Sequence, residues 1–136
     1  MPILLFVIWA SNPTLASAPQ PFHSNLLELE FIERGVVTDY IREMNTNELI
    51  EMVNGKFPET KCIIQHESNF KEDAIGDSGK AVGILQFWES TFEHYKNKYK
   101  EQLDYKKANH QIILYYLMVR ENKSNLSHWT AWKYCK

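Results

Sequence analysis

Glu67 is the residue whose setting points most directly to chemistry. It lies near the end of residues 57–67, a largely apolar stretch that carries a proline at its start and no later breaker, so the pattern predicts a helix. A carboxyl group among apolar side chains keeps its proton to higher pH, because burial disfavours the charged form. Such an acid can protonate the oxygen that departs when a glycosidic bond is cut. Apolar residues downstream can close over it: Phe70, Leu85, Phe87 and Trp88.

A second motif follows and makes the pattern specific. The chain reads Glu67-Ser68-Asn69-Phe70, then Ala74, then Ala81-Val82-Gly83-Ile84-Leu85-Gln86, then Thr91. This arrangement resembles the signature of the soluble lytic transglycosylase family, strongly over residues 58–91 and weakly as far as Cys135. The resemblance implies a lysozyme-like fold. It also implies an enzyme that cuts peptidoglycan strands between N-acetylmuramic acid and N-acetylglucosamine.

The resemblance further implies roles for single residues. Glu67 would be the sole catalytic carboxylate, Ser68 would help to hold the substrate, and Gln86 would line the groove. Glu67 would first give its proton to the bridging oxygen. As a carboxylate it would then remove a proton from the C6 hydroxyl of the muramic acid, which closes a 1,6-anhydro ring without attack by water. One carboxylate is then enough, whereas ordinary glycosidases use two.

The chain departs from the family pattern near its C-terminus. The family carries an Ala-Tyr-Asn triplet whose tyrosine stands near the catalytic glutamate, and this sequence has none. It ends instead in an aromatic tail (residues 128–135), which resembles small lysozyme-like domains that finish in a Trp and Cys motif. We hypothesise that Trp129 or Tyr134 replaces the missing tyrosine. Trp88 and Trp129 are candidates for stacking on sugar rings, although core packing is the commoner fate of tryptophan and is expected for Trp132.

Two other functions fit parts of the pattern. In a hydrolytic muramidase, Asp77 or Asp73 would position a water, and the Gly76-Asp77 pair resembles that of goose-type lysozymes. Both aspartates are also ordinary turn residues. A non-catalytic peptidoglycan-binding module needs no buried acid, so the intact Glu67-Ser68 pair favours an enzyme. A transglycosylase releases 1,6-anhydro products, a muramidase releases reducing ends, and a binding module releases nothing.

Helices must position these motifs. The spacing of apolar residues predicts several such helices. One is expected over residues 37–44, and Asn45 can cap the next. Further helices are expected over residues 88–99 and 104–120. Residues 69–83 are rich in Asp, Gly and Ser, which predicts a loop or short hairpin. The expected fold class is α+β, predominantly α, with a helical core beside this loop or hairpin. The first helix would place these residues on its apolar side: Val37, Tyr40, Ile41 and Met44.

The length of 136 residues leaves room for one compact domain. We expect it at residues 36–136, after a poorly ordered lead segment at residues 19–35. Residues 1–18 carry no charge and end in Ala16-Ser17-Ala18, which predicts a secretory signal peptide, the alternative being a core segment. Their apolar stretch is shorter than the roughly 20 residues that span a bilayer. We therefore expect no stable membrane insertion after signal removal, and a secreted or periplasmic protein at the cell wall.

The net charge and the cysteine content limit the kinds of partner and bound group that we expect. A net charge of -2 argues against nucleic acid, whose phosphates attract basic proteins. Cys62 and Cys135 are the only cysteines, and in an oxidising compartment they predict one disulfide, the alternative being two buried thiols. Without further Cys or His ligands they predict no zinc site. We expect no metal, no cofactor, peptidoglycan glycan strands as the partner, and a monomer.

Overall fold

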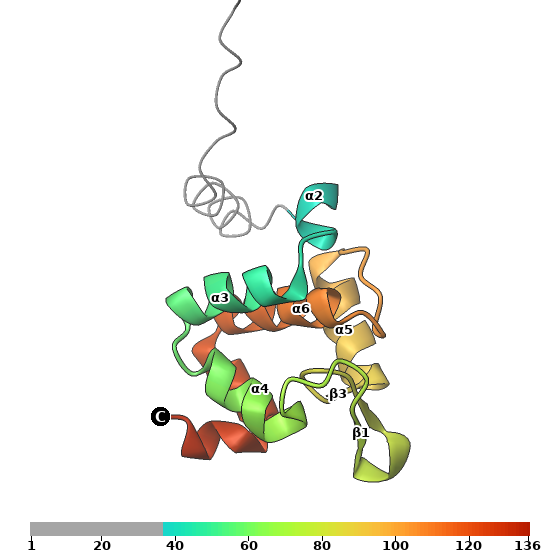
Figure 1. The fold of residues 1–136 in the computed structure, drawn as a ribbon. Helices are drawn as coiled ribbons and strands as arrows, with labels where there is room; N and C mark the ends of the chain where they lie inside the picture. Colours follow the sequence, from blue (N-terminus) through green and yellow to red (C-terminus); the bar gives the residue numbers. More distant parts are fainter. Residues whose placement is uncertain (1–36) are drawn as a thin grey trace, which may run out of the picture.

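The computed structural model describes residues 37–136, which form helices around a central helix, beside a small sheet (Figure 1). The expected fold class, α+β and predominantly α, is confirmed. The predicted signal peptide and lead segment lie outside the described residues. The elements in chain order are α2 (Asp39–Arg42), α3 (Thr46–Lys56), α4 (Thr60–Ser68), β1 (Ile75–Gly76), η1 (Asp77–Gly79), β2 (Ala81–Val82), β3 (Phe87–Trp88), α5 (Glu89–Tyr99), α6 (Ala108–Glu121), η2 (Lys123–His128) and η3 (Thr130–Tyr134), where η marks a 3-10 helix.

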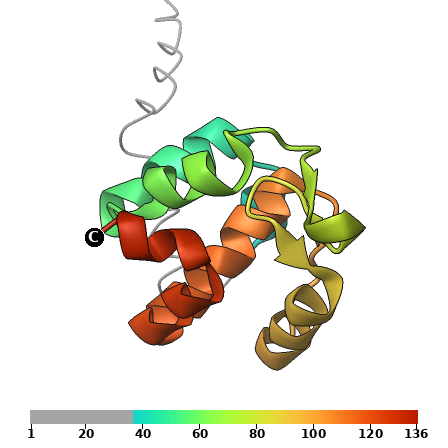
Figure 2. The same cartoon turned by 90° about the horizontal axis from the view of Figure 1, so that it is seen from below.

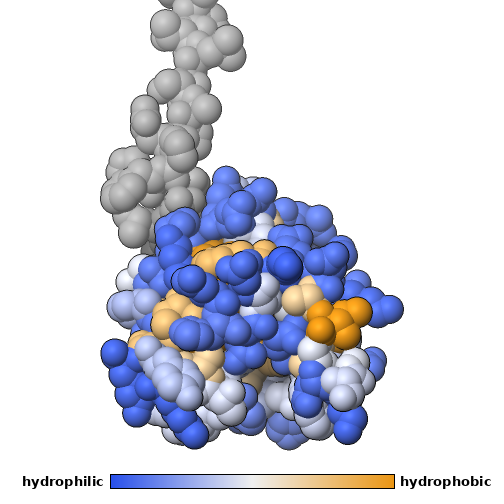
Figure 3. All heavy atoms as spheres, turned by 60° about the horizontal axis from the view of Figure 1, so that its bottom comes forward, coloured by the Kyte–Doolittle hydropathy of each residue, from blue (hydrophilic) through white to orange (hydrophobic). Residues whose placement is uncertain are grey.

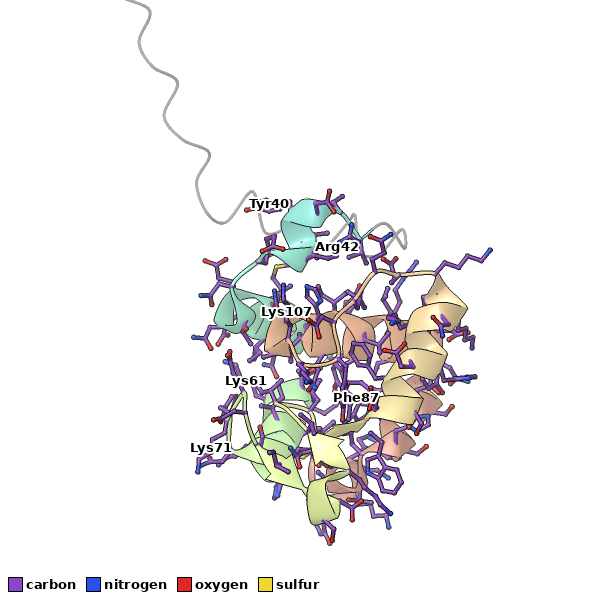
Figure 4. The ribbon with its side chains drawn as sticks, turned by 90° about the vertical axis from the view of Figure 1, so that its right-hand side faces the viewer. Tyr40, Arg42, Lys61, Lys71, Phe87 and Lys107 are labelled. Carbon is purple, nitrogen blue, oxygen red and sulfur yellow. A yellow bond between two sulfur atoms is a disulfide. The ribbon has the colours of Figure 1, made fainter. Side chains whose placement is uncertain are left out.

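Helix α6 forms the centre of the core because it is apolar on nearly every side. Its residues from His110 to Val119 are all buried, and such a helix needs cover all round. Helix α3 lies along it, while α5 and η2 pack against other sides (Figure 1). Phe87 points from β3 into this core, with its ring against Phe92 and Trp129 (Figure 4). Among the described helices, none is both long enough and apolar enough to span a bilayer.

Helix α4 begins later than its sequence suggests. Pro58, expected in the first helical turn, lies in a separate turn before the helix. The backbone N–H and the hydroxyl of Thr60 both donate to the carbonyl oxygen of Phe57, at 3.0 and 2.7 Å, which closes that turn. At the other end the chain leaves the helix through Asn69, whose φ of 51° is left-handed. Glu67 therefore occupies the last turn of α4, where the sequence predicts it.

Two other elements differ from expectation. Helix α6 begins at Ala108 rather than at Asp104, because the Asp104 carboxylate accepts the backbone N–H of Lys106 (2.9 Å) and forms a turn. Helix α2 is only 4 residues long, and Tyr40 is 63% exposed and points away from the core (Figure 4). The predicted cap of α3 is confirmed, since the Asn45 side chain accepts a backbone N–H of the first turn at 2.9 Å.

The segment predicted as a loop or short hairpin forms part of an antiparallel sheet in the order β1-β2-β3. Val82 of the middle strand lies opposite Ile75 on one side and opposite Phe87 on the other. The strands are short, so the sheet depends on the helices around it for its position.

The turn between β2 and β3 (residues 83–86, the hairpin turn) is largely buried, so its backbone polar groups need partners within the protein. Gln111 of α6 supplies one of these partners and also binds the backbone on either side. Its Oε1 accepts the N–H of Leu85 (3.1 Å), and its Nε2 donates to the carbonyl of Val82 and to one in the loop before α6 (both 2.9 Å). Gly83 has a φ of 87°, and a Cβ there would lie 2.3 Å from Gln111 Nε2. Only glycine allows this approach.

Two further side chains bind the hairpin turn from other directions. The Ser68 hydroxyl at the end of α4 donates to the carbonyl of Ile84 at 2.7 Å. The indole Nε1 of Trp129 donates to the carbonyl of Leu85 at 2.8 Å. Helix α6, helix α4 and the aromatic tail therefore meet on one short stretch of backbone.

The predicted disulfide is present between Cys62 and Cys135, with Cα atoms 5.6 Å apart and a sequence separation of 73. Cys62 lies in α4, while Cys135 follows η3. The bond thus ties the aromatic tail to α4, and η3 packs against α4 (Figure 2).

Replacing Gln111 by methionine tests its role in holding the hairpin turn. The change keeps the side-chain volume but leaves buried backbone groups without partners, which costs about 3 kcal/mol or more of unfolding free energy. Urea unfolding of the full chain measures this loss. The matched control is Gln65→Met on the exposed side of α4, expected within about 0.5 kcal/mol of the parent. Equal stability of the two variants would contradict the assignment.

Removing the disulfide tests how far it stabilises the fold. In the variant with both Cys62→Ala and Cys135→Ala, we expect to lose up to about 4 kcal/mol, because a long loop is no longer closed in the unfolded chain. Urea unfolding without reductant measures the change, and the parent protein with reductant should approach the variant. An unfolding midpoint equal to that of the oxidised parent would show that the bond contributes nothing.

Candidate active site

A hollow of about 350 Å³ opens between the end of α4, the sheet and the aromatic tail. Figure 2 shows these three parts from the same side, and Figure 3 shows the surface indented between two lobes on this side. We call it the catalytic hollow, because Glu67, the residue expected from the sequence to be the catalytic acid, lies in its wall. Its lining residues are Glu67, Asp77, Ala81, Gln86, Phe87, Trp88, Thr91, His128, Trp129 and Thr130.

Glu67 is half-buried in the wall of this hollow. Burial raises the pKa of its carboxyl group above the ordinary value, while a hydrogen bond from the backbone N–H of Ala131 and the charge of His66 oppose the rise. Burial is the largest of these effects, so the net shift is upward. A carboxyl group that retains its proton and faces an open hollow is suited to general acid catalysis. Once ionised it keeps the Ala131 hydrogen bond, which supports the second role of a base.

The position of Glu67 depends on two attachments of α4. Ser68, the next residue, binds the carbonyl of Ile84 and so fixes the end of the helix to the hairpin turn. The disulfide at Cys62, between one and two helical turns earlier, fixes the same helix to the aromatic tail, whose Ala131 hydrogen bonds to the carboxylate. The tail is therefore part of the site, as its sequence position near a cysteine suggested.

Gln86 lies in the wall of the catalytic hollow with a left-handed φ of 50°. Its Nε2 donates to the carbonyls of Ala74 (3.0 Å) and Gly83 (2.8 Å), so the amide group is anchored within the sheet region. Ser68, by contrast, is not among the lining residues and is only 8% exposed. Its hydroxyl is already engaged by the hairpin turn, which gives it a positioning contact in this structure.

The aromatic residues considered for sugar stacking or for the missing tyrosine differ in how far their side chains are exposed. Trp88 is 45% exposed on the rim of the catalytic hollow. Trp129 also lines the hollow but is only 4% exposed, with its ring against Phe87 and Tyr115 in the core. Tyr134 is 76% exposed, lies outside the lining and has its ring 5.9 Å from that of His66. Of the two residues considered for the missing tyrosine, Trp129 alone borders the hollow.

The two aspartates lie in different places. Asp77 lines the catalytic hollow from η1, with an exposed side chain. Asp73 is exposed and is not among the lining residues. A second carboxylate thus borders the same hollow as Glu67, on the opposite, sheet side of it.

His128 is a site residue that the sequence analysis did not single out. Asn125 Nδ2 donates to the carbonyl of Met118 (2.8 Å), which leaves Asn125 Oδ1 to accept the hydroxyl of Tyr95 (3.3 Å). The Tyr95 hydroxyl oxygen also lies 2.9 Å from His128 Nε2, so a hydrogen bond joins the two side chains. The position of His128 beside Trp129 in the aromatic tail was the available signal. Thr91, Thr130 and Ala131 carried no chemical signal of their own.

Metal-ligand atoms also gather on the back of α4. No histidine was expected beside the cysteines, whereas in the structure the ligand atoms of Cys62, His66 and Cys135 lie within 4.8 Å of one another. The two sulfurs are bonded to each other, and a disulfide presents no thiolate to a metal ion. In its oxidised form this cluster consists of a structural disulfide with a histidine beside it.

Comparison with known protein families identifies the family of this chain. The model of the transglycosylase SLT domain matches residues 44–132, a span that runs from before α3 into η3 and contains every residue of the catalytic hollow. Comparisons with curated proteins and with solved structures gave no match. The family match covers well over half of the chain and agrees with the observed fold. The chain belongs to the transglycosylase SLT domain family, whose lysozyme-like domains act lytically on peptidoglycan.

Proposed function

We propose that this protein is a lytic transglycosylase that cleaves the β-1,4 bond between N-acetylmuramic acid and N-acetylglucosamine and leaves 1,6-anhydro ends. The observation that carries this proposal is the half-buried carboxyl group of Glu67, with a raised pKa, facing a hollow within the family-matched region. The reaction needs one group that serves first as acid and then as base. Glu67 has the surroundings for both.

In the first step, Glu67 donates its proton to the glycosidic oxygen as that bond breaks. The carboxylate that results accepts the N–H of Ala131, which offsets part of the cost of holding a charge in a partly buried place. In the second step, the carboxylate takes the proton of the C6 hydroxyl as that oxygen bonds to the anomeric carbon. The proton is returned to Glu67, and the enzyme regains its starting state.

The other lining residues have roles in holding the sugar. Trp88, half exposed on the rim, offers a flat apolar face to a sugar ring. Gln86 and His128 offer polar groups at the wall of the hollow. Trp129 forms the floor of the hollow through its core contacts. Ser68, predicted to bind substrate directly, contributes by fixing the end of α4 beside the glutamate.

A hydrolytic muramidase is the second candidate, because Asp77 borders the same hollow as Glu67. In that reaction Asp77 would position a water molecule, and the product would have a reducing end. Glu67 is the acid in both reactions, and the first is favoured because the family that the chain resembles uses one catalytic carboxylate.

The proposed substrate gives the protein a place of action. Peptidoglycan lies outside the cytoplasmic membrane, and the disulfide is a bond of oxidising compartments. Both fit a chain that is exported through the signal peptide predicted at residues 1–18 and acts, secreted or periplasmic, at the wall.

Glu67→Gln tests the central residue. We expect cleavage of purified peptidoglycan to fall by about 10²–10⁴-fold, because the amide can neither give nor take the proton. The variant should fold as stably as the parent or more stably. Burial raises the pKa of the carboxyl group, so its ionisation destabilises the native state, and this cost appears as pH rises through the raised pKa. The melting temperature of the variant should therefore equal the parent's in acid and match or exceed it at neutral pH.

The matched control is Asp73→Asn, which removes an exposed carboxylate outside the catalytic hollow. We expect it to leave both the rate and the melting temperature unchanged. A Glu67→Gln protein as active as the parent would overturn the site assignment.

The products decide between the two candidate reactions. Mass spectrometry of digests should find 1,6-anhydro-muropeptides with both the parent and Asp77→Asn, because no water is needed in the proposed reaction. The rate of Asp77→Asn should stay within a few-fold of the parent. Reducing ends from the parent, together with loss of activity in Asp77→Asn, would show a muramidase instead.

A further inference from the structure

A second hollow adjoins the catalytic one and shares a wall with it. It has a volume of about 420 Å³ and lies between the sheet, the start of α5 and the loop before α6. Trp88 borders both hollows. We call the second one the lysine hollow, and its lining residues are Gly79, Lys80, Val82, Trp88, Glu89, Ser90, Tyr105 and Lys106.

The lysine hollow carries an excess of positive charge. Lys80 and Lys106 contribute two ammonium groups and Glu89 one carboxylate, which leaves one positive charge in a chain whose net charge is -2. Among the ion pairs of residues 37–136, none involves either lysine. Lys80 Nζ lies 5.4 Å from the centroid of the Trp88 ring instead. Both ammonium groups are thus available to an anion.

The walls of the lysine hollow are ordered by hydrogen bonds. The hydroxyl of Tyr105 donates to the carbonyl of Phe87 at 2.8 Å, which joins the loop before α6 to β3. The Asp104 carboxylate accepts the backbone N–H of Lys106 at 2.9 Å, which fixes the turn that carries this lysine. The hollow is therefore positioned relative to Trp88, and through it relative to the sugar site.

We propose that the lysine hollow binds a carboxylate of the peptide stem attached to the muramic acid. This inference rests on the proposed function, because it takes the glycan strand to lie in the catalytic hollow. The stem leaves the sugar through its lactyl group and carries the carboxylates of peptidoglycan, while the sugars around it are largely neutral. When a sugar of the strand packs against one side of Trp88, the peptide stem with its carboxylates extends past the same side chain, toward Lys80 and Lys106. The enzyme then prefers peptide-bearing strands to bare glycan.

Lys106→Gln is the direct test, because Lys106 borders only the lysine hollow. Initial rates are measured on purified sacculi and on the same sacculi after carbodiimide-promoted amidation of the stem carboxylates, which removes these anions and keeps the stems. On sacculi we expect KM to rise roughly two- to five-fold with kcat unchanged, the size of a partly exposed ion pair. Adding Lys80→Gln should raise KM further, and Glu89→Gln should lower it.

The matched control is Lys71→Gln, which removes the same charge from the loop after α4, away from the lysine hollow (Figure 4). On the amidated sacculi, Lys106→Gln and Lys71→Gln should behave alike. Equal losses for the two variants on sacculi, or equal losses of Lys106→Gln on both substrates, would show general charge attraction and overturn the inference. The proposed function fails separately, if Glu67→Gln cleaves either substrate as the parent does.

Discussion

The buried backbone of the hairpin turn is the constraint on which the rest of the site depends. Its N–H and carbonyl groups lie away from solvent and must find partners within the protein. Three side chains provide them: Gln111 from α6, Ser68 from α4 and Trp129 from the aromatic tail. Because Ser68 adjoins Glu67 and the turn ends in Gln86, satisfying these groups also places the proposed acid opposite the sheet. Site geometry and fold stability thus share the same hydrogen bonds.

The aromatic tail completes the site from the other side. Burial raises the pKa of the Glu67 carboxyl group, while Ala131 of the tail supplies a hydrogen bond that supports the ionised form. Both effects act on the ionised form, in opposite directions, which suits a residue that must give a proton and then take one back. The disulfide at Cys62 and Cys135 keeps the tail against α4. Trp129 of this tail, one of the two residues considered for the missing tyrosine, borders the same hollow as Glu67.

Local patterns predicted the parts of the site that depend on neighbours in sequence. Glu67 was identified by the apolar stretch before it and by its motif, and the cap at Asn45 by residue type. Gln111 was not identified, because its partner Leu85 lies 26 residues away and nothing in α6 marks one glutamine as buried. Ala131 acts through its backbone, which sequence does not distinguish. The start of α6 was misplaced because Asp104 forms a turn that competes with the helix.

The central claim is that Glu67 keeps its proton because its surroundings are partly apolar. Carbon-13 NMR of the glutamate side-chain carboxyl carbons, with Glu67→Gln used to assign the resonance, follows its ionisation directly in the full chain. The account predicts a titration midpoint above that of the exposed glutamates in the same spectra. A midpoint at or below theirs would contradict it, because the carboxyl group would then be an ordinary solvated anion at neutral pH.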